Sequence, residues 1–279
     1  MMRRGRLLVS LACLLAVGSA CSAGSDDPDP TPAPPDVTLS FTQLLPDEGT
    51  NKGLLRVVNE SADPLPVTEA GLRWSGYGEF LDPQDSTLAP GQTLDLHVLL
   101  PPARCEEGDE PIVGVVRTPT AEVAQPLTSS GQEFLHHLWL RGCQADLVHD
   151  NVTITYARDW SIGTAHGEPA AVGSLLLERN DGTEPVTVRS FRGSVLYGAE
   201  LPAPVVARAS APTTLVPLVI LPGNRCDEHA RGQATAPFTF RITVDVGDTS
   251  TKVLVVPPER VQEIATEVLD RACVQRAAG

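Results

Sequence analysis

The chain has 279 residues, of which 42% are hydrophobic and only 4% aromatic, and its formal net charge at pH 7 is −14. This length suits about two domains, whose cores must consist mostly of Val, Leu, Ile and Ala. The acidic charge argues against nucleic-acid binding and against electrostatic attachment to anionic lipid headgroups, because like charges repel. The 25 prolines and 23 glycines favour a β-rich chain with many turns.

The first twenty residues have the pattern of a bacterial export signal. Three arginines among the first six residues precede residues 7–17, an apolar segment that is too short to span a membrane. Gly18-Ser19-Ala20-Cys21 then resembles the lipobox of bacterial lipoproteins, although Gly18 stands where that family usually has Leu. The resemblance implies that residues 1–20 are removed and that Cys21 carries a lipid. The alternative is ordinary signal-peptide cleavage nearby, which would give a soluble secreted protein.

Residues 21–36 have the composition of a disordered tether. Five prolines and three acidic residues precede Asp36, and the segment offers nothing apolar to bury. At ~3 Å per residue, an extended tether of this kind would hold the first domain roughly 40 Å from the membrane. We therefore expect the chain to lie on the extracytoplasmic face of the cell membrane, anchored through Cys21.

The remainder of the chain contains two copies of one module. Residues 100–107 and 221–228 share leucine, proline, arginine, cysteine and acid at the same offsets, so that Cys226 follows Cys105 by 121 residues (226 − 105). A repeat of that length is a domain. We predict a first domain over residues 37–147 and a second over residues 148–279.

Each module contains about seven short segments of strand character separated by turn residues. This pattern is typical of an immunoglobulin-like β-sandwich. In residues 259–273, which follow two prolines, apolar side chains recur at helical spacing and predict a C-terminal helix. Residues 133–143 predict a shorter or ambiguous helix, followed by a short link to Val152. The predicted fold class is all-β: two tandem immunoglobulin-like sandwiches with a short C-terminal helix.

The lipobox-like segment, the two sandwiches and the repeated Arg-Cys-acid motif together resemble uncharacterised actinobacterial lipoproteins with immunoglobulin-like domains. The preference for arginine over lysine also resembles products of high-GC genomes, since Lys52 and Lys252 are the only lysines. The resemblance implies an exported, lipid-anchored protein and brings no established activity.

Four cysteines remain in the two modules, and they allow three pairings. The repeat favours pairing equivalent positions within each module, Cys105 with Cys143 and Cys226 with Cys273. An oxidising, exported location permits disulfides, and closing loops of this length stabilises each module by about 3–4 kcal/mol on the chain-entropy model. A zinc site that includes Cys226 and His229 is the alternative, but the first module has Gly108 at the position equivalent to His229.

The strand before each Arg-Cys motif differs between the modules. In residues 94–100, the apolar residues Leu94, Leu96, Val98 and Leu100 share one face, and Asp95 and His97 face the other. Carrying this pattern forward by 121 residues places Val216, Leu218 and Ile220 on the outer face of the second strand. We therefore predict these three residues as a candidate interface, covered by a partner, by the other module or by a long loop.

The sequence carries no motif of a known catalytic or metal site. The six histidines are scattered, and adjacent acids such as Asp227-Glu228 would point to opposite faces of a strand. We expect no catalytic residues, no metal and no cofactor. The predicted function is a cell-envelope lipoprotein that acts as a non-catalytic binding or assembly module, with an envelope protein as a possible partner. The alternative is a carrier or sensor that binds a small solute between the two domains.

Overall fold

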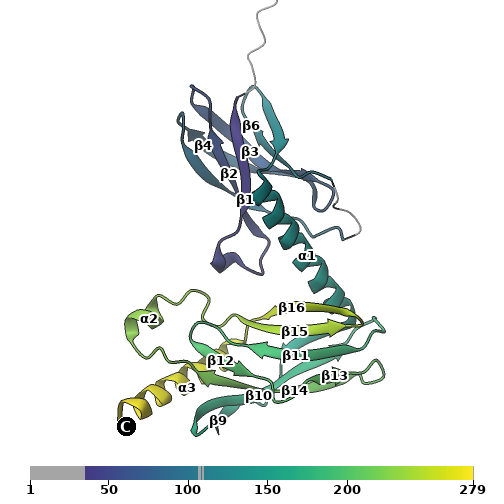
Figure 1. Cartoon of the computed structure of the whole chain (residues 1–279), viewed down its shortest axis with the longest axis vertical. Helices are drawn as coiled ribbons and strands as arrows, with labels where there is room; N and C mark the ends of the chain where they lie inside the picture. Colours follow the sequence, from purple (N-terminus) through teal and green to yellow (C-terminus); the bar gives the residue numbers. More distant parts are fainter. Residues whose placement is uncertain (1–34, 106–107, 109, 279) are drawn as a thin grey trace, which may run out of the picture. The chain divides into compact units, whose positions relative to one another are not determined.

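The computed structural model describes residues 35–105, 108 and 110–278, so the signal sequence, Cys21 and nearly all of the tether lie outside the described residues. The described residues form one compact unit that contains two β-sandwich modules (Figure 1). The predicted fold class is confirmed, because most of the ordered secondary structure lies in four antiparallel sheets and the chain ends in a helix.

The first module is a sandwich of a three-stranded and a four-stranded sheet. The sheets have the orders β1-β2-β5 and β4-β3-β6-β7, which is an immunoglobulin-like arrangement of seven strands. Alternation of buried and accessible residues along β1 places Val37, Leu39 and Phe41 in the core. The strands are β1 (Val37–Thr42), β2 (Lys52–Asn59), β3 (Leu65–Trp74), β4 (Gly78–Leu88), β5 (Thr93–Leu99), β6 (Val113–Arg117) and β7 (Glu122–Pro126).

The second module repeats this arrangement with more strands. One sheet has the order β12-β14-β10-β8, with β9 also paired to β10, and the other has the order β13-β11-β15-β16. Where the first module has the single strand β4, the second has two strands, of which β12 pairs with β14 and β13 pairs with β11. The strands are β8 (Val152–Tyr156), β9 (Ser161–Ala165), β10 (Glu168–Arg179), β11 (Val186–Arg192), β12 (Tyr197–Glu200), β13 (Val205–Ala207), β14 (Thr213–Pro222), β15 (Phe240–Val246) and β16 (Thr249–Val255).

Helix α1 (Ser129–Asn151) is much longer than the helix predicted over residues 133–143. The Thr128 side chain accepts a hydrogen bond from the backbone N–H of Gly131 and so caps its start. No proline or glycine follows Cys143 to end the helix, which continues until β8 begins at Val152. The expected link between Cys143 and Val152 is therefore helical, and the boundary predicted between residues 147 and 148 falls inside α1.

Helix α1 contributes to both cores. Leu135 belongs to the core of the first module and Val148 to the core of the second. A Cβ atom at Gly131 would lie 2.7 Å from the backbone nitrogen of Phe41, so only glycine lets the helix pack this closely on β1.

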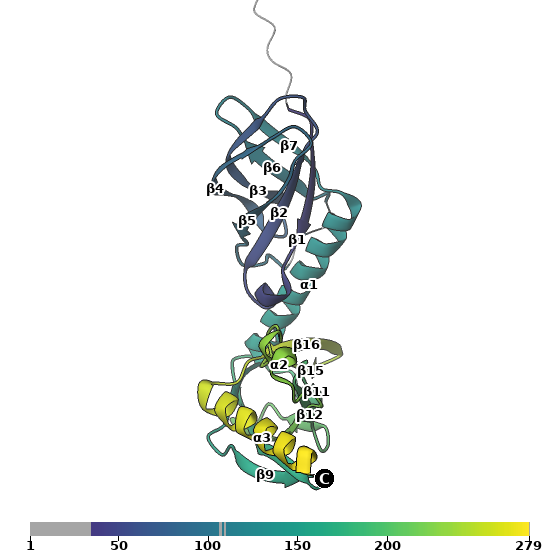
Figure 2. The same ribbon diagram turned by 90° about the vertical axis from the view of Figure 1, so that its left-hand side faces the viewer.

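The C-terminal helix α3 (Glu259–Ala278) packs against β9, β10 and β14 (Figure 2). Its buried residues Val261, Ala265, Val268 and Leu269 belong to the core of the second module. Two shorter elements complete the fold, the 3-10 helix η1 (Leu45–Asp47) and helix α2 (Glu228–Gly232).

Both disulfides are the predicted ones. Cys105 is bonded to Cys143 and Cys226 to Cys273, with Cα–Cα distances of 5.4 and 5.5 Å. Each bond joins the loop after a core strand, β5 or β14, to the helix that follows the module's last strand, α1 or α3. Because Cys226 is bonded to another cysteine, its sulfur is not available as a thiolate for a zinc site with His229.

The predicted interface is wrong, because Val216, Leu218 and Ile220 are each 0% exposed and lie in the core of the second module. The residues that face outward on β14 are the alternate ones, and Leu215 is 56% exposed. The two Arg-Cys motifs are 121 residues apart, but a residue that lies 121 positions after a core-facing residue of β5 faces outward on β14. A one-residue difference in a strand moves every side chain to the opposite face, so the prediction exchanged the two faces.

Candidate ligand cavity

A cavity of about 610 Å³ is lined by the loop after η1, the turn after β3, the segment after β5, helix α1, and the hairpin of β15 and β16. Its walls include Tyr77 and Leu100, both buried, and the partly buried Leu138 and Leu254. Its charged lining residues are Glu48, Arg141, Arg241 and Lys252. The volume lies within the range of cavities that hold small organic ligands.

A tight turn places Glu48 at this cavity. The backbone carbonyl of Asp47 accepts hydrogen bonds from the backbone N–H of Thr50 at 2.9 Å and from its hydroxyl at 2.8 Å. Gly49 has φ +83, a left-handed conformation that favours glycine, and a Cβ atom there would lie 2.7 Å from Leu254 Cδ1. The side chain of Glu48 is only 19% exposed.

Two arginines meet this one carboxylate. Arg141 Nη1, from α1, lies 3.5 Å from Glu48 Oε1, and Arg241 Nη2, from β15, donates a hydrogen bond to Glu48 Oε2. Lys252 of β16 is a third cation in the lining. The lining therefore carries three basic groups and one acidic group, in a chain whose net charge is −14.

Neighbouring contacts join the same elements. The Thr251 hydroxyl of β16 donates a hydrogen bond to Gln144 Oε1 of α1 at 2.9 Å. Burial raises the pKa of Tyr77 to about 12, an effect that the positive charge of Arg141 partly opposes. Tyr77 is therefore a neutral phenol at physiological pH.

The chemistry of the lining suits binding. The lining sets polar and charged groups beside apolar side chains. The polar groups are guanidinium, ammonium, carboxylate, phenol, hydroxyl and amide groups. These groups can hold and orient a ligand that has one charged end and one apolar end.

The other residues singled out in the sequence lie away from this cavity or outside the described residues. Cys21 is outside the described residues. His136 packs against Trp139 with ring centroids 5.2 Å apart, and the Asp227 side chain accepts a hydrogen bond from Ala230 N and caps α2. Within the described residues, no group of three or more His, Cys, Asp or Glu side chains is placed to hold a metal ion. No helix in that part of the chain is long and apolar enough to cross a membrane.

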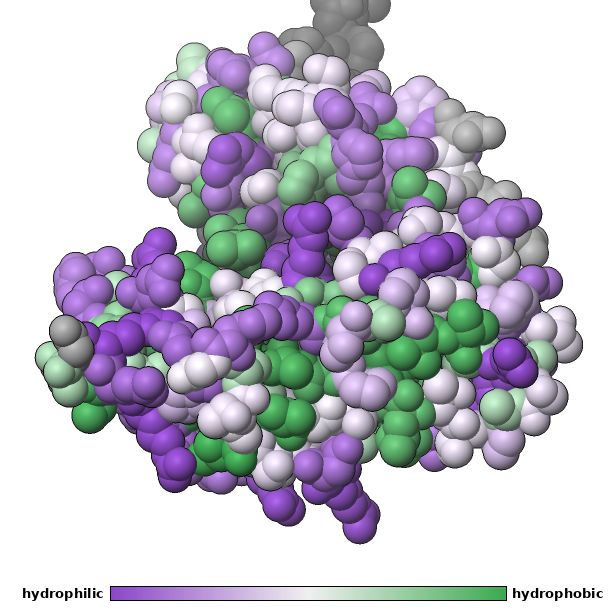
Figure 3. Space-filling view, turned by 60° about the horizontal axis from the view of Figure 1, so that its bottom comes forward, coloured by the Kyte–Doolittle hydropathy of each residue, from purple (hydrophilic) through white to green (hydrophobic). Residues whose placement is uncertain are grey.

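The outer face of the sheet that contains β14 carries exposed apolar side chains, and these are not the residues predicted from the sequence. Leu215 is 56% and Val172 is 36% exposed, and Pro217 is also exposed on this face. The strand register places Val219 directly beside Val172 and Leu215 beside Leu176. Figure 3 brings forward the part of the molecule that carries β9, β10, β13 and β14 in Figure 1, and hydrophobic residues gather there.

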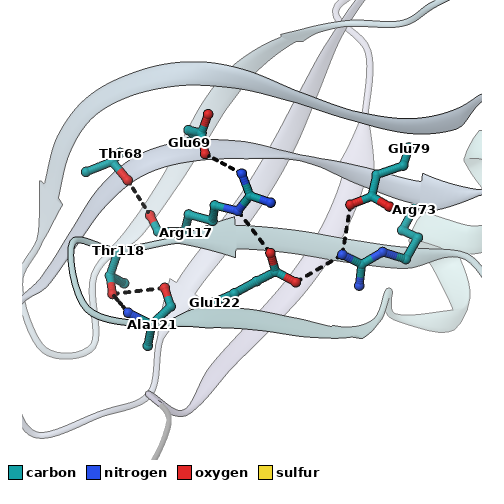
Figure 4. Close-up of polar contacts among 8 residues, drawn as sticks. All are labelled: Thr68, Glu69, Arg73, Glu79, Arg117, Thr118, Ala121 and Glu122. Atoms are coloured by element: carbon teal, nitrogen blue, oxygen red, sulfur yellow. Dashed lines mark hydrogen bonds and ion pairs between the residues drawn. The ribbon is translucent and has the colours of Figure 1, made fainter.

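The outer face of the four-stranded sheet in the first module is instead covered by ion pairs. Arg73 contacts Glu79 at 2.9 Å and Glu122 at 3.0 Å, and Arg117 contacts Glu122 at 2.9 Å and Glu69 at 2.8 Å (Figure 4). These five residues come from β3, β4, β6 and β7 and join all four strands. The two modules thus share a fold but present different surfaces.

The fold and the disulfides define a tandem β-sandwich protein with a disulfide between the loop after a core strand and the helix at the end of each module. No protein-family model matches the chain, and a search of curated proteins returned no match.

The alternative function predicted from the sequence placed a solute site between the two domains, but the sequence identified none of the residues that line this cavity. Glu48, Arg141, Arg241 and Lys252 lie in four separate segments, and none belongs to a recognisable motif. Of these residues, only Lys252 is unusual in the sequence, as one of two lysines. The cavity depends on α1 running without a break from one sandwich into the other. The prediction of a short link after Cys143 did not include this continuous helix.

Proposed function

We propose that the protein is a lipid-anchored protein of the cell envelope, related to the actinobacterial lipoproteins that it resembles, and that it acts as a non-catalytic binding module. The lipobox-like segment that ends at Cys21 and the proline-rich tether support the anchoring. The cavity among η1, α1 and β16 is the observation that supports binding. In this proposal the ligand is a small organic molecule held outside the membrane.

Native mass spectrometry of protein extracted from its own envelope tests this function. We expect a mass in excess of the lipidated polypeptide, corresponding to a bound small molecule. Ala145 lines the cavity from α1 and its side chain is exposed, so Ala145→Trp should fill the cavity without disturbing either core and should remove the excess mass. Ala277→Trp, at an exposed position of α3, is the matched control and should keep it.

Two results would contradict the proposal. One is wild-type protein that never carries a small molecule. The other is an Ala145→Trp variant that carries the same molecule in the same amount, because the molecule would then bind elsewhere.

Assembly with an envelope protein is the second candidate function, and the exposed apolar face around Leu215 favours it. The acidic residues Glu178 and Glu200 lie in the strands of the same sheet, which argues against anionic headgroups as the covering surface. A photo-crosslinking amino acid at Leu215 should capture one defined protein in intact envelopes. The same group at Arg56, exposed on the first module, should not. Equal capture at both positions would count against this function.

A further inference from the structure

The cavity contains more hydrogen-bond donors than its own contacts use. Each guanidinium group has five N–H donors and the lysine ammonium has three. Among the described residues, Glu48 is the sole hydrogen-bond partner of the Arg141 and Arg241 side chains, and it meets one nitrogen of each. The Lys252 ammonium makes no hydrogen bond or ion pair within this part of the chain.

This positive charge is local. The chain as a whole carries −14, and its long-range field repels anions. An anion that enters the cavity meets three basic groups and one carboxylate, at the boundary of an apolar wall where water screens charges less than in bulk. Arginine is suited to this role because its planar donors match carboxylate, sulfonate and phosphate groups.

The rest of the lining is apolar. Leu100 is 4% exposed, and Leu138, Val253 and Leu254 are partly buried. They come from the segment directly after β5, from α1 and from β16, so apolar side chains line the cavity from several parts of the fold. A ligand that consisted of an acidic group alone would leave this surface in contact with water.

We infer that the cavity binds a small organic anion with an apolar body. Its acidic group lies among Arg141, Arg241 and Lys252, and its body lies against Leu138 and Leu254. This inference rests on the proposed binding function and adds the chemical class of the ligand. It concerns one site and one chemical class of ligand, and it holds whether the ligand is a metabolite or a component of the envelope.

A matched pair of fluorescent probes tests the inference. 1-Anilinonaphthalene-8-sulfonate and N-phenyl-1-naphthylamine have the same aromatic rings, and only the first carries an anionic group. The titrations use the chain from Ser22 to Gly279, which keeps every residue of both cores and should therefore fold without the lipid. We expect the sulfonate to bind at least fivefold more tightly than the neutral probe.

The two lysines of the chain provide a matched pair of variants. Lys252 lines the cavity, whereas Lys52 on β2 lies outside its lining, and both side chains are exposed. Removing one contact with a partly solvated cation costs about 1 kcal/mol, or about fivefold in affinity. Lys252→Gln should therefore weaken the sulfonate about fivefold and leave the neutral probe unchanged. Lys52→Gln should change neither.

The cavity-filling variant Ala145→Trp separates failure of this inference from failure of the proposed function. If it abolishes binding of both probes, and wild type binds them equally well, the cavity is a ligand site but the preference for anions is wrong. If Ala145→Trp leaves binding of both probes intact, the probes bind elsewhere, and both the inference and the cavity function are wrong. Loss of sulfonate binding in Ala145→Trp, combined with the selective effect of Lys252→Gln, supports both.

Discussion

The orientation of β14 can be tested by two identical substitutions at positions that the sequence and the structure assign to opposite faces. Leu218 is 0% exposed and lies in the core, whereas Leu215 is 56% exposed. Truncating a fully buried leucine to alanine removes its packing contacts and leaves a cavity, at a cost of about 3 kcal/mol within a range of roughly 2–5 kcal/mol. At an exposed position the same truncation changes stability by about 0.5 kcal/mol or less.

We therefore expect Leu218→Ala to lower the free energy of unfolding by at least about 1.5 kcal/mol more than Leu215→Ala. The measurement is urea denaturation followed by circular dichroism and tryptophan fluorescence, with the denaturant dependence of each variant compared first. Trp160 is buried in the core of the second module and reports on it directly. Equal destabilisation by the two variants, or a larger effect of Leu215→Ala, would refute the face assignment.

Cys21→Ala should release the protein from the membrane into the medium, and fractionation that finds the variant still on membranes would contradict lipid anchoring. Replacing Cys226 and Cys273 together by alanine should lower the free energy of unfolding by about 3–4 kcal/mol, because the disulfide closes a loop with a sequence separation of 47; unchanged denaturation would argue against a stabilising bond. Burial raises the pKa of all three tyrosines, to about 12 for Tyr77, so phenolate absorbance of the folded protein should rise at a higher pH than that of the protein unfolded in urea. Because the folded-state pKa of Tyr77 lies above its unfolded value, the contribution of this tyrosine to the free energy of unfolding is complete below pH ~10 and declines as the pH rises towards 12. Phenolate formation at the pH of an exposed tyrosine, without unfolding, would contradict this.

The features that could be predicted from the sequence are those that depend on local alternation and on the repeat. Strand character follows from the two-residue period of segments such as Val37–Phe41, because side chains in a strand point to alternate faces. The repeat also selected the cysteine pairs, since equivalent positions in two copies of one fold occupy equivalent places. Neither inference required knowledge of how distant segments meet.

Two predictions were wrong for physical reasons: the face assignment on β14 failed by a single-residue offset, and the predicted end of α1 came too early. The Arg-Cys motif marks a loop, and a loop can absorb one residue, but a strand cannot do so without exchanging its faces. For this reason the predicted outer face of β14, made of Val216, Leu218 and Ile220, is its core face. The length of α1 was missed because residues 144–151 have weak helical periodicity, and the helix there is supported by tertiary contacts such as that of Val148 with the second core.

The residues of the cavity could not have been predicted, because their juxtaposition requires the path of α1 and the pairing of β15 with β16 at the same time. Arg141 and Arg241 are a hundred residues apart in the sequence and share only their contact with Glu48. A charged residue on a helix or strand is usually a solvated surface group, and nothing in the sequence distinguishes these arginines from the others.

A crystal structure of the chain with bound 1-anilinonaphthalene-8-sulfonate would show whether the cavity is the ligand site. We expect the sulfonate within hydrogen-bond distance, about 3 Å, of Arg141, Arg241 or Lys252, with the aromatic rings against Leu254. A probe bound to the outer face of β14 at Leu215, with the cavity empty, would contradict the claim that the cavity is the ligand site.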